Sequence, residues 1–241
     1  SFGSLTDALA QTIESGGGKI SSRTEVTRIE VAQGKVTGVK VQGRETFSCD
    51  AVIATIPNQA LLRLASEFPP TYKRQLESIS YLAALCLVLV LKKSFMPVYW
   101  LNIADTSLPF VAAIEHTNLV PLAHYRGHHI LYLSHYLPQE DPLCKLSPGE
   151  MLEHELPYLK RLNPAFDKAD VEGYHLFYEE AAQPIVTAFY SQKRPSMVTP
   201  ISGLYLANTS QIYPQHRGMN YSLSMCREIA HRVAGEGREH D

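Results

Sequence analysis

The most informative stretch for predicting the fold is GLYLANTS at residues 203–210, followed by RGMNYS at residues 217–222. The apolar run from Leu204 to Ala207 predicts a short buried strand, and the small polar residues after it predict a turn. Gly218 then allows a close approach of the backbone before a helix over residues 220–233 begins. The apolar residues of that helix recur on one side, at Leu223, Cys226, Ile229, Ala230 and Val233. The end of the chain is therefore expected to form a strand, a turn and a helix.

A second group of elements is expected in the first 57 residues. A helix is predicted over residues 4–15 because Leu5, Leu9 and Ile13 recur every four residues, and the glycines at 16–18 end it. A helix, a hairpin and a buried strand within so short a length indicate a mixed sheet. The strands are expected over residues 19–22, 25–31, 35–41, 46–49 and 51–56, where Pro57 stops the last one.

The middle of the chain is expected to contain both helices and a larger sheet. The run YLAALCLVLVL at residues 81–91 is predicted to be a long central strand, with a buried helix as the alternative. A helix over residues 148–162 would have Ser147 as its cap and Pro148 as its first residue. Other helices are expected over 59–65 and 71–78, and other strands over 98–103, 110–115, 130–135, 171–179 and 185–191.

The composition excludes several classes of protein. The chain has 22 Lys and Arg against 24 Asp and Glu, so its net charge of −2 provides no basic surface for nucleic acid. The longest apolar run, residues 81–91, is shorter than the ~20 residues that a transmembrane helix needs. The four cysteines are far apart and form no CxxC pair, which favours free thiols in a reducing compartment. We expect a cytoplasmic protein with no nucleic-acid partner and no transmembrane segment.

Three segments together resemble one family of flavoproteins. They are VTRIE at residues 26–30, DAVIATIP at residues 50–57, and the closing motifs at residues 203–210 and 217–222. In this order they are similar to the C-terminal part of FAD-dependent oxidoreductases of the amine oxidase and protoporphyrinogen oxidase type, a group that includes phytoene desaturase-like proteins. The resemblance implies an oxidoreductase whose cofactor is FAD.

The resemblance also implies which residues lie beside the cofactor. Backbone groups near Val26 would meet the adenine side of FAD, and Thr55 and Pro57 would lie in a turn next to it. Helix amides and the helix dipole would place partial positive charge beside the flavin ring. The closing motifs would supply Asn208, Gly218, Met219 and Asn220 to this part of the site.

The sequence departs from the family pattern in the closing motifs. Asn208, Thr209 and Ser210 stand where the family usually has an acidic residue after the closing strand. Met219 stands where amine oxidases place an aromatic residue at the start of the last helix. The tail ANTS at residues 207–210 is nearer to that of protoporphyrinogen oxidases, so amine deamination is not the expected reaction.

A larger departure is the phosphate-binding loop. No GxGxxG motif follows a strand anywhere in the sequence, and the glycines at 16–18 follow a helix and act as a stop signal. We therefore expect this chain to be a fragment whose partner is the missing N-terminal Rossmann segment of the same protein. Alone, the chain is expected to bind FAD poorly or not at all.

The expected fold class is α+β: a mixed-sheet remnant of an FAD-binding domain plus a substrate domain with a largely antiparallel sheet and flanking helices. Residues 1–57 with 196–241 would form the partial FAD-binding domain, and residues 58–195 the substrate domain. The parent protein is expected to oxidise a small-molecule substrate by hydride transfer to flavin, and the fragment to be inactive. The sequence identifies no catalytic residue, because in this family the flavin performs the redox step.

Two alternatives stay open. A flavin-dependent sugar-nucleotide isomerase resembling UDP-galactopyranose mutase shares this architecture and would need arginines that bind a diphosphate. Arg194 and Arg217 are the candidates for that role. In isolation, the chain would be a non-catalytic binding domain.

The middle region offers candidate residues for a substrate pocket, namely Tyr132, Tyr178 and Arg217. Strand residues two apart face the same way, so Tyr132 is expected to share a face with Ser134, and Tyr178 with Tyr174. Packing of a half-buried sheet is the competing explanation for these tyrosines.

Two other patterns are interpreted as structural. The histidines in HYRGHH, residues 124–129, have helical spacing for a metal site, but Gly127 interrupts any helix there, so we expect a polar loop and no metal. Glu179 and Glu180 are adjacent on a predicted strand and would point to opposite faces, so they cannot act as a catalytic pair.

Overall fold

The computed structural model describes residues 2–43 and 46–236, and these residues divide into two compact units. Unit 1 consists of the described residues up to Glu77, of Pro195–Gln211, and of those from Gly218 onward. Unit 2 consists of Ser78–Arg194 and Ile212–Arg217. The chain therefore passes from unit 1 to unit 2 and back, and then crosses to unit 2 once more for residues 212–217.

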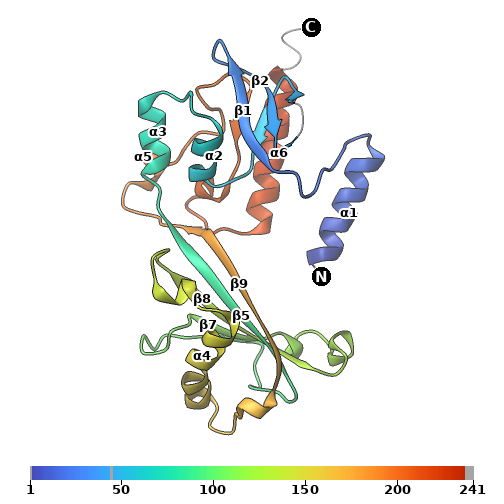
Figure 1. The fold of residues 1–241 in the computed structure, drawn as a ribbon, viewed down its shortest axis with the longest axis vertical. Helices are drawn as coiled ribbons and strands as arrows, with labels where there is room; N and C mark the ends of the chain where they lie inside the picture. Colours follow the sequence, from blue (N-terminus) through green and yellow to red (C-terminus); the bar gives the residue numbers. More distant parts are fainter. Residues whose placement is uncertain (1, 44–45, 237–241) are drawn as a thin grey trace. The chain divides into compact units, whose positions relative to one another are not determined.

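Unit 1 contains two small sheets and four helices among the residues that the structure describes (Figure 1). One sheet is antiparallel in the order β1-β2-β3, and the other is a parallel pair of β10 and β4. A 3₁₀ turn, η5 (Thr209–Gln211), follows β10. The other elements are α1 (Phe2–Ser15), β1 (Val26–Ala32), β2 (Lys35–Val41), β3 (Phe47–Ser48), β4 (Val52–Ala54), α2 (Asn58–Leu64), α3 (Pro70–Glu77), β10 (Leu204–Leu206) and α6 (Met219–Glu236).

The core of unit 1 joins the two sheets to α2 and α3. Leu61 of α2 and Leu76 of α3 are fully buried in the same cluster as Leu204 and Leu206 of β10. The approach of β10 to β4 requires a glycine at position 203, which has a φ of +75°. A Cβ atom there would lie 2.6 Å from the carbonyl oxygen of Asp50, a contact that no side chain tolerates.

Unit 2 is built on one antiparallel sheet of five strands in the order β6-β7-β8-β5-β9. Its strands are β5 (Tyr81–Leu91), β6 (Trp100–Asn102), β7 (Ala112–Glu115), β8 (His129–Leu137) and β9 (Val171–Pro184). Its helices and 3₁₀ turns are η1 (His116–Asn118), η2 (Leu122–Tyr125), η3 (Pro142–Lys145), α4 (Pro148–Leu162), η4 (Lys168–Asp170) and α5 (Tyr190–Lys193).

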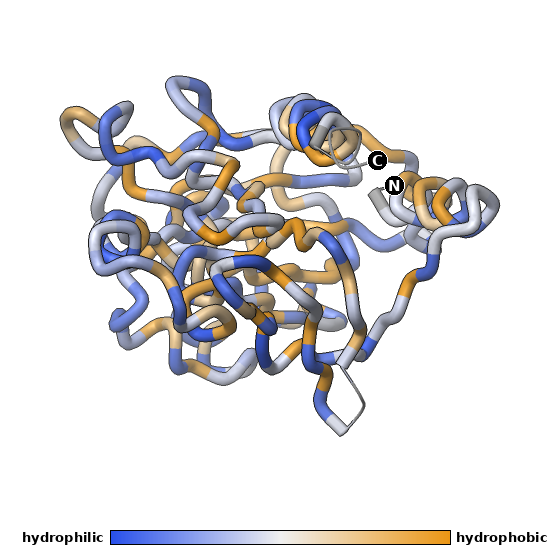
Figure 2. The backbone as a smooth tube through the Cα atoms, turned by 90° about the horizontal axis from the view of Figure 1, so that it is seen from above, coloured by the Kyte–Doolittle hydropathy of each residue, from blue (hydrophilic) through white to orange (hydrophobic). Residues whose placement is uncertain are grey.

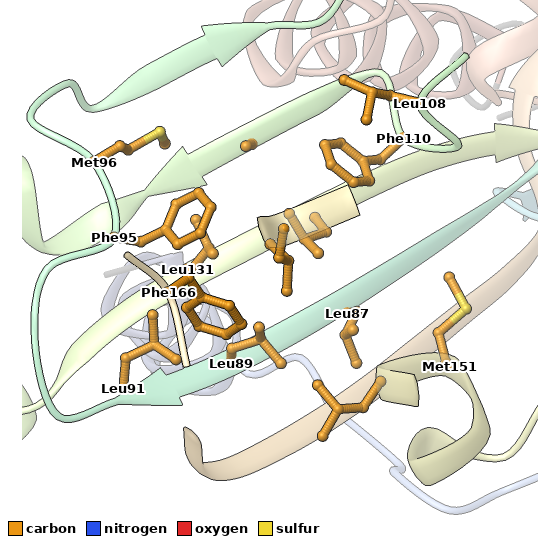
Figure 3. Packing of buried hydrophobic residues seen from close by; sticks show 14 residues of the cluster. Leu87, Leu89, Leu91, Phe95, Met96, Leu108, Phe110, Leu131, Met151 and Phe166 are labelled. Atoms are coloured by element: carbon orange, nitrogen blue, oxygen red, sulfur yellow. The ribbon is translucent and has the colours of Figure 1, made fainter. Parts of the chain in front are cut away.

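The two faces of this sheet differ in burial. Leu87, Leu89 and Leu91 of β5 are almost inaccessible to solvent and pack with Met151 of α4 and Phe166. Figure 3 shows the three leucines on one side of β5 within this cluster. The alternate residues of β5, among them Leu82 and Ala84, are only half-buried. One face is therefore the core of unit 2, and the other is a second, more accessible surface.

Helix α4 begins as its sequence predicts. Ser147 Oγ accepts a hydrogen bond from the backbone N–H of Glu150, and the Glu150 carboxylate accepts one from the N–H of Ser147. Hydrogen bonds with Ser147 lower the pKa of Glu150 below its ordinary value. This reciprocal capping box explains why the helix starts at Pro148.

Several boundaries differ from the expected ones. Residues 58–77 belong to unit 1 and not to the middle piece, because α2 and α3 pack in the core of unit 1. Residues 19–22 form no strand. The strand expected over 185–191 is also absent, because β9 ends at Pro184 and Phe189 adopts a left-handed conformation with a φ of 60° before α5.

Part of the side of α6 that was predicted to pack is exposed in the structure. Met225, Ile229 and Val233 contact the core, and Ile229 is buried. Leu223, by contrast, is 54% exposed, and Cys226 is exposed as well. In Figure 2, apolar segments are likewise visible on the helix next to the N label, α1, where Leu5 and its neighbours on the stripe are exposed. Unit 1 thus presents apolar surface that no described residue covers.

The two faces of β5 predict different responses to truncation. Leu87→Ala should lower the free energy of unfolding of unit 2 by about 2–5 kcal/mol, because it leaves a cavity in a closed core. Leu82→Ala, on the half-buried face, should cost about 1 kcal/mol or less. Urea unfolding followed by the fluorescence of Trp100, the single tryptophan and a residue of unit 2, measures both. Equal losses of unfolding free energy in the two variants would show that the two faces of β5 are misassigned.

Candidate functional site

The parallel pair in unit 1 creates an edge where two turns leave the sheet together. Val52, Ile53 and Ala54 of β4 lie opposite Leu204, Tyr205 and Leu206 of β10. The backbone N–H of Ala207 donates to the carbonyl of Ala54 at 2.9 Å, so the two chains separate only beyond this point. Ligands of open α/β sheets bind outside the carboxyl ends of parallel strands. The residues after Ala54 and Ala207 are therefore the candidate site.

Asn208 and Asn58 join the two turns by buried hydrogen bonds. The side-chain amide of Asn208 donates to the Ile56 carbonyl at 2.8 Å and to Asn58 Oδ1 at 2.9 Å. Asn208 Oδ1 accepts from the backbone N–H of Ser210 at 3.0 Å and from its Oγ at 2.7 Å. Asn208 is 6% exposed and Asn58 is inaccessible. These contacts fix the turn after β4 against the turn after β10.

Gln211 completes this network from the end of η5. Its Oε1 accepts from the backbone N–H of Asn208 at 2.9 Å, and its Nε2 donates to the Leu206 carbonyl at 2.9 Å. The sequence did not single out Asn58 or Gln211. The signal that could have found Asn58 is the repetition of one pattern, an asparagine shortly after the end of each parallel strand.

The structure changes what Asn208 can contribute to a cofactor site. Its side-chain nitrogen donates two hydrogen bonds and its oxygen accepts two, so its full capacity is used within the protein. Thr55 is exposed and Pro57 is half-buried at the same edge, and both remain available for a ligand. The backbone N–H and carbonyl of Asn208 are also engaged, with Gln211 Oε1 and the Gln211 N–H, so the contact of Asn208 with a cofactor stays a prediction.

The start of α6 is accessible and well anchored further along. Met219 is 43% exposed and Asn220 is exposed, and the first amides of a helix have no intrahelical acceptor. A Cβ atom at Gly218 would lie 2.8 Å from Asn220 Oδ1, the mobile end of a side chain. The helix is held in place through Ile229, which packs with Tyr205 and Ala207.

Val26 lies at the start of β1, opposite Val41 of β2. A surface hollow of about 480 Å³ opens immediately before it, and Arg23 in its wall has a left-handed φ of 52°. Such conformations cost energy in residues other than glycine and cluster at functional sites. The residues that line the hollow are Arg23, Thr24, Glu25, Val41 and Gln42.

The three candidate pocket residues of unit 2 do not share one place. Tyr132 lies opposite Val88, whereas Tyr178 lies opposite Leu85, so they occupy different faces of the sheet. Tyr178 does share its face with Tyr174, as expected, and this is the face that α4 covers. Arg217 lies with Tyr132 on the other face, where it contacts Tyr136. Their roles in substrate binding stay predictions.

The two arginines suggested for a diphosphate have different surroundings. Arg194 Nη1 donates to the Tyr213 carbonyl at 3.5 Å. Arg217 Nε donates to Gln183 Oε1 at 2.6 Å, and its Nη2 donates to the Tyr136 hydroxyl. These contacts are with different residues and do not indicate a shared diphosphate clamp.

His128 and His129 pair with carboxylates of neighbouring strands. His128 pairs with Glu172 at 2.5 Å, and His129 pairs with Glu115 at 3.1 Å. Within residues 2–43 and 46–236, no three His, Cys, Asp or Glu side chains are arranged to hold a metal ion.

The four cysteines are free. None of the helices in the described part of the chain is long and apolar enough to cross a membrane.

The sequence analysis did not identify two buried carboxylates in unit 2. Glu115 Oε2 accepts from the backbone N–H groups of Phe95 and Met96, at 2.9 and 2.6 Å. Glu155 Oε1 lies 3.2 Å from His135 Nε2 and 3.0 Å from His154 Nδ1. Both glutamates are inaccessible to solvent and connect elements of the core, so they are structural groups.

Comparison with known proteins identifies the family. The family model described as flavin containing amine oxidoreductase matches residues 2–216, so the chain belongs to that family. The match ends just before Gly218. No curated protein sequence matches the chain.

Solved structures show the same fold. An oxidoreductase from Methanosarcina mazei is 24% identical, with a TM-score of 0.64 over 84% of this chain and 47% of its own. A protein from Exiguobacterium sp. 255-15, assigned provisionally as a protoporphyrinogen oxidase, is 15% identical, with a TM-score of 0.66 over 85% of this chain and 46% of its own. A double mutant of putrescine oxidase is 13% identical, with a TM-score of 0.71 over 93% of this chain and 51% of its own. The chain therefore spans about half the length of each, and its α+β architecture is that of this fold.

The asparagine network predicts non-additive losses of stability. Asn208→Ala should lower the free energy of unfolding by about 1–3 kcal/mol, because it leaves buried groups without partners. Asn58→Ala should do the same, and the double variant should lose less than the sum, with a coupling of about 0.5–3 kcal/mol. Urea unfolding followed by far-UV circular dichroism measures the cycle. Exposed Asn220→Ala is the control, within about 0.5 kcal/mol of the unaltered chain. Additive losses would contradict a shared network.

Proposed function

We propose that this chain is part of a longer protein that oxidises a small molecule by hydride transfer to FAD. Unit 1 would contribute part of the cofactor site, and unit 2 would bind the substrate. The observation that carries the proposal is the carboxyl edge of β4 and β10, where Thr55, Pro57 and Ala207 leave a parallel pair side by side. The family to which the chain belongs supports FAD as the ligand of that edge.

The residues present fit such a cofactor. Thr55 and Pro57 would contact it from the turn after β4, and the amides of Met219 and Asn220 would face it from the start of α6. A helix N-terminus favours negative charge by about 0.3–1 kcal/mol. The hollow beside Val26 would take the adenine end, since the polar residues Arg23, Thr24 and Gln42 are among those that line it.

FAD would supply the acceptor for the hydride, and the protein would supply position and electrostatics. The side chains at the carboxyl edge support this division of roles. Thr55, Pro57, Asn208, Met219 and Asn220 carry no group that gains or loses a proton near neutral pH. The edge would bind and orient the cofactor without exchanging protons with the substrate.

The remaining part of the cofactor site would come from a Rossmann segment that this chain does not contain. Parallel sheets are normally covered on both faces, yet Ile53 of β4 is 40% exposed, and the stripe of Leu5, Leu9 and Ile13 on α1 is exposed too. A segment carrying the phosphate loop would bury this surface and hold the pyrophosphate. We keep a cytoplasmic location as a proposal, supported by the free cysteines.

Residues 1–241, purified alone, should therefore be colourless. The reason is that no GxGxxG loop is present to hold the pyrophosphate. The longer protein, including the Rossmann segment, should purify with flavin absorbance. A stoichiometric flavin spectrum in the 241-residue chain would contradict the proposal.

Gly218→Val tests the position of the flavin directly. A valine should obstruct the cofactor at the start of α6 and weaken FAD binding to the longer protein by about tenfold or more, which corresponds to 1.4 kcal/mol. The fold should tolerate the change, because the nearest obstacle is the mobile Asn220 side chain. Gly235→Ala, at the other end of α6 with nothing within 4 Å, is the matched control. Quenching of flavin fluorescence measures both, and equal affinities would mean that this helix is scaffold.

A further inference from the structure

The accessible face of the unit 2 sheet has a floor of small side chains. We define the open face by residues that point away from α4 on neighbouring strands. Cys86 of β5 lies opposite Ser134 of β8 and Phe177 of β9, and Ala84 lies opposite Tyr136. Directly opposed residues of antiparallel strands share a face. Phe177 is 61% exposed, and the others are half-buried.

One end of the open face is closed by aromatic rings. His116 makes edge contacts with Tyr132 and Tyr125, with ring centroids 5.8 and 5.7 Å apart. Beneath this end, Val88 and Ile130 are buried although they belong to the open face. The segment from η1 to η2 therefore forms an apolar, aromatic wall at this end.

Arg217 lies at the other end of the open face. Its Nε donates to Gln183 Oε1 at 2.6 Å, its Nη2 donates to the Tyr136 hydroxyl, and its guanidinium carbon is 5.3 Å from the centre of the Tyr136 ring. All three residues belong to unit 2. The partners are neutral, and no carboxylate in the described part of the chain forms an ion pair with Arg217. A half-buried cation is thus fixed in place with Nη1 free to donate.

The other ionisable groups of the open face do not neutralise this charge. Burial raises the pKa of Cys86 to about 11 and also raises the pKa of Tyr132, so both are uncharged near neutral pH. Glu179 lies opposite Ala84 as an exposed carboxylate; its Oε1 accepts from the backbone N–H of Ala181, and it forms no ion pair with Arg217. His175 lies exposed opposite Val88, toward the aromatic end. Arg217 is the fixed positive group at its end of the face.

We propose that the open face binds a ligand with an apolar body and one anionic group, and that Arg217 binds the anion. A planar guanidinium matches a carboxylate or a similar oxyanion better than any neutral group. The apolar body would lie over Ala84, Cys86 and Ser134 toward the aromatic wall. Tyr132 and Tyr136 are four residues apart on β8, so the ligand would span about 13 Å.

This inference rests on the proposed function in one respect, since it makes that ligand the substrate of unit 2. An acidic apolar substrate also explains why a cation occupies this face, where the ammonium group of an amine would be repelled. The binding of the anion itself does not depend on flavin. Failure of the inference and failure of the flavin proposal can therefore be told apart by experiments without and with FAD.

The test uses two dyes with the same aromatic body on the 241-residue chain. They are 1-anilinonaphthalene-8-sulfonate, which carries an anion, and uncharged N-phenyl-1-naphthylamine. Energy transfer from Trp100, which lies on β6 of the same sheet, reports binding near the open face. Arg217→Gln should weaken binding of the sulfonate dye by about tenfold or more, which is the effect expected from losing hydrogen bonds to a charged group. It should leave binding of the neutral dye unchanged. Arg217→Lys keeps the charge but lacks the planar guanidinium that Gln183 and Tyr136 hold, so it should restore only part of the affinity.

Lys160→Gln is the matched control, because it removes an exposed cation from α4, on the covered face of the sheet. It should change the binding of neither dye. If Arg217→Gln does not fold, the unaltered chain still decides: dodecanoate should displace the sulfonate dye at about tenfold lower concentration than dodecanol. Equal loss of both dyes, an unchanged sulfonate affinity in Arg217→Gln, or equal displacement by acid and alcohol would overturn the proposal.

Discussion

The buried hydrogen bond between Asn58 and Asn208 is the constraint on which the candidate site depends. Each asparagine follows a strand of the parallel pair, and their side-chain contact at 2.9 Å holds two turns that are 150 residues apart in sequence. Burying a side-chain amide is unfavourable unless each of its donors and acceptors has a hydrogen-bond partner. Asn208 meets this condition. Because the turns are fixed, Thr55 and Pro57 keep a defined position at the edge where a cofactor would bind.

Unit 2 depends on a different constraint, the alternation of side chains along β5. Leu87 and Leu89 face a closed core, while Ala84 and Cys86 face an accessible surface of small residues. The same strand therefore stabilises the unit with one face and leaves the other accessible to solvent. Fixed cations and aromatic side chains at opposite ends of an apolar face are features of small-molecule sites, in which few polar groups orient a mostly apolar ligand.

Local signals predicted much of the fold, and long-range packing determined the rest. The strand over residues 81–91 and the capped start of the helix at Pro148 follow from an apolar run and a capping box, which need no distant partner. The family resemblance was confirmed. The packing side of α6 was predicted correctly at Ile229 and Val233 and wrongly at Leu223, which has a suitable spacing but lies outside the core cluster. The partnership of Asn58 with Asn208 depends on pairing between distant strands, which one sequence does not reveal.

We infer that the carboxyl edge of β4 and β10 and the start of α6 face the flavin in the longer protein. This placement can be tested by amide hydrogen exchange of that protein, measured with and without FAD. We expect slower exchange on FAD binding in peptides covering residues 53–58, 207–211 and 218–222, with the strands of the unit 2 core unaffected. Protection confined to other regions, with unchanged exchange in these three peptides, would contradict it.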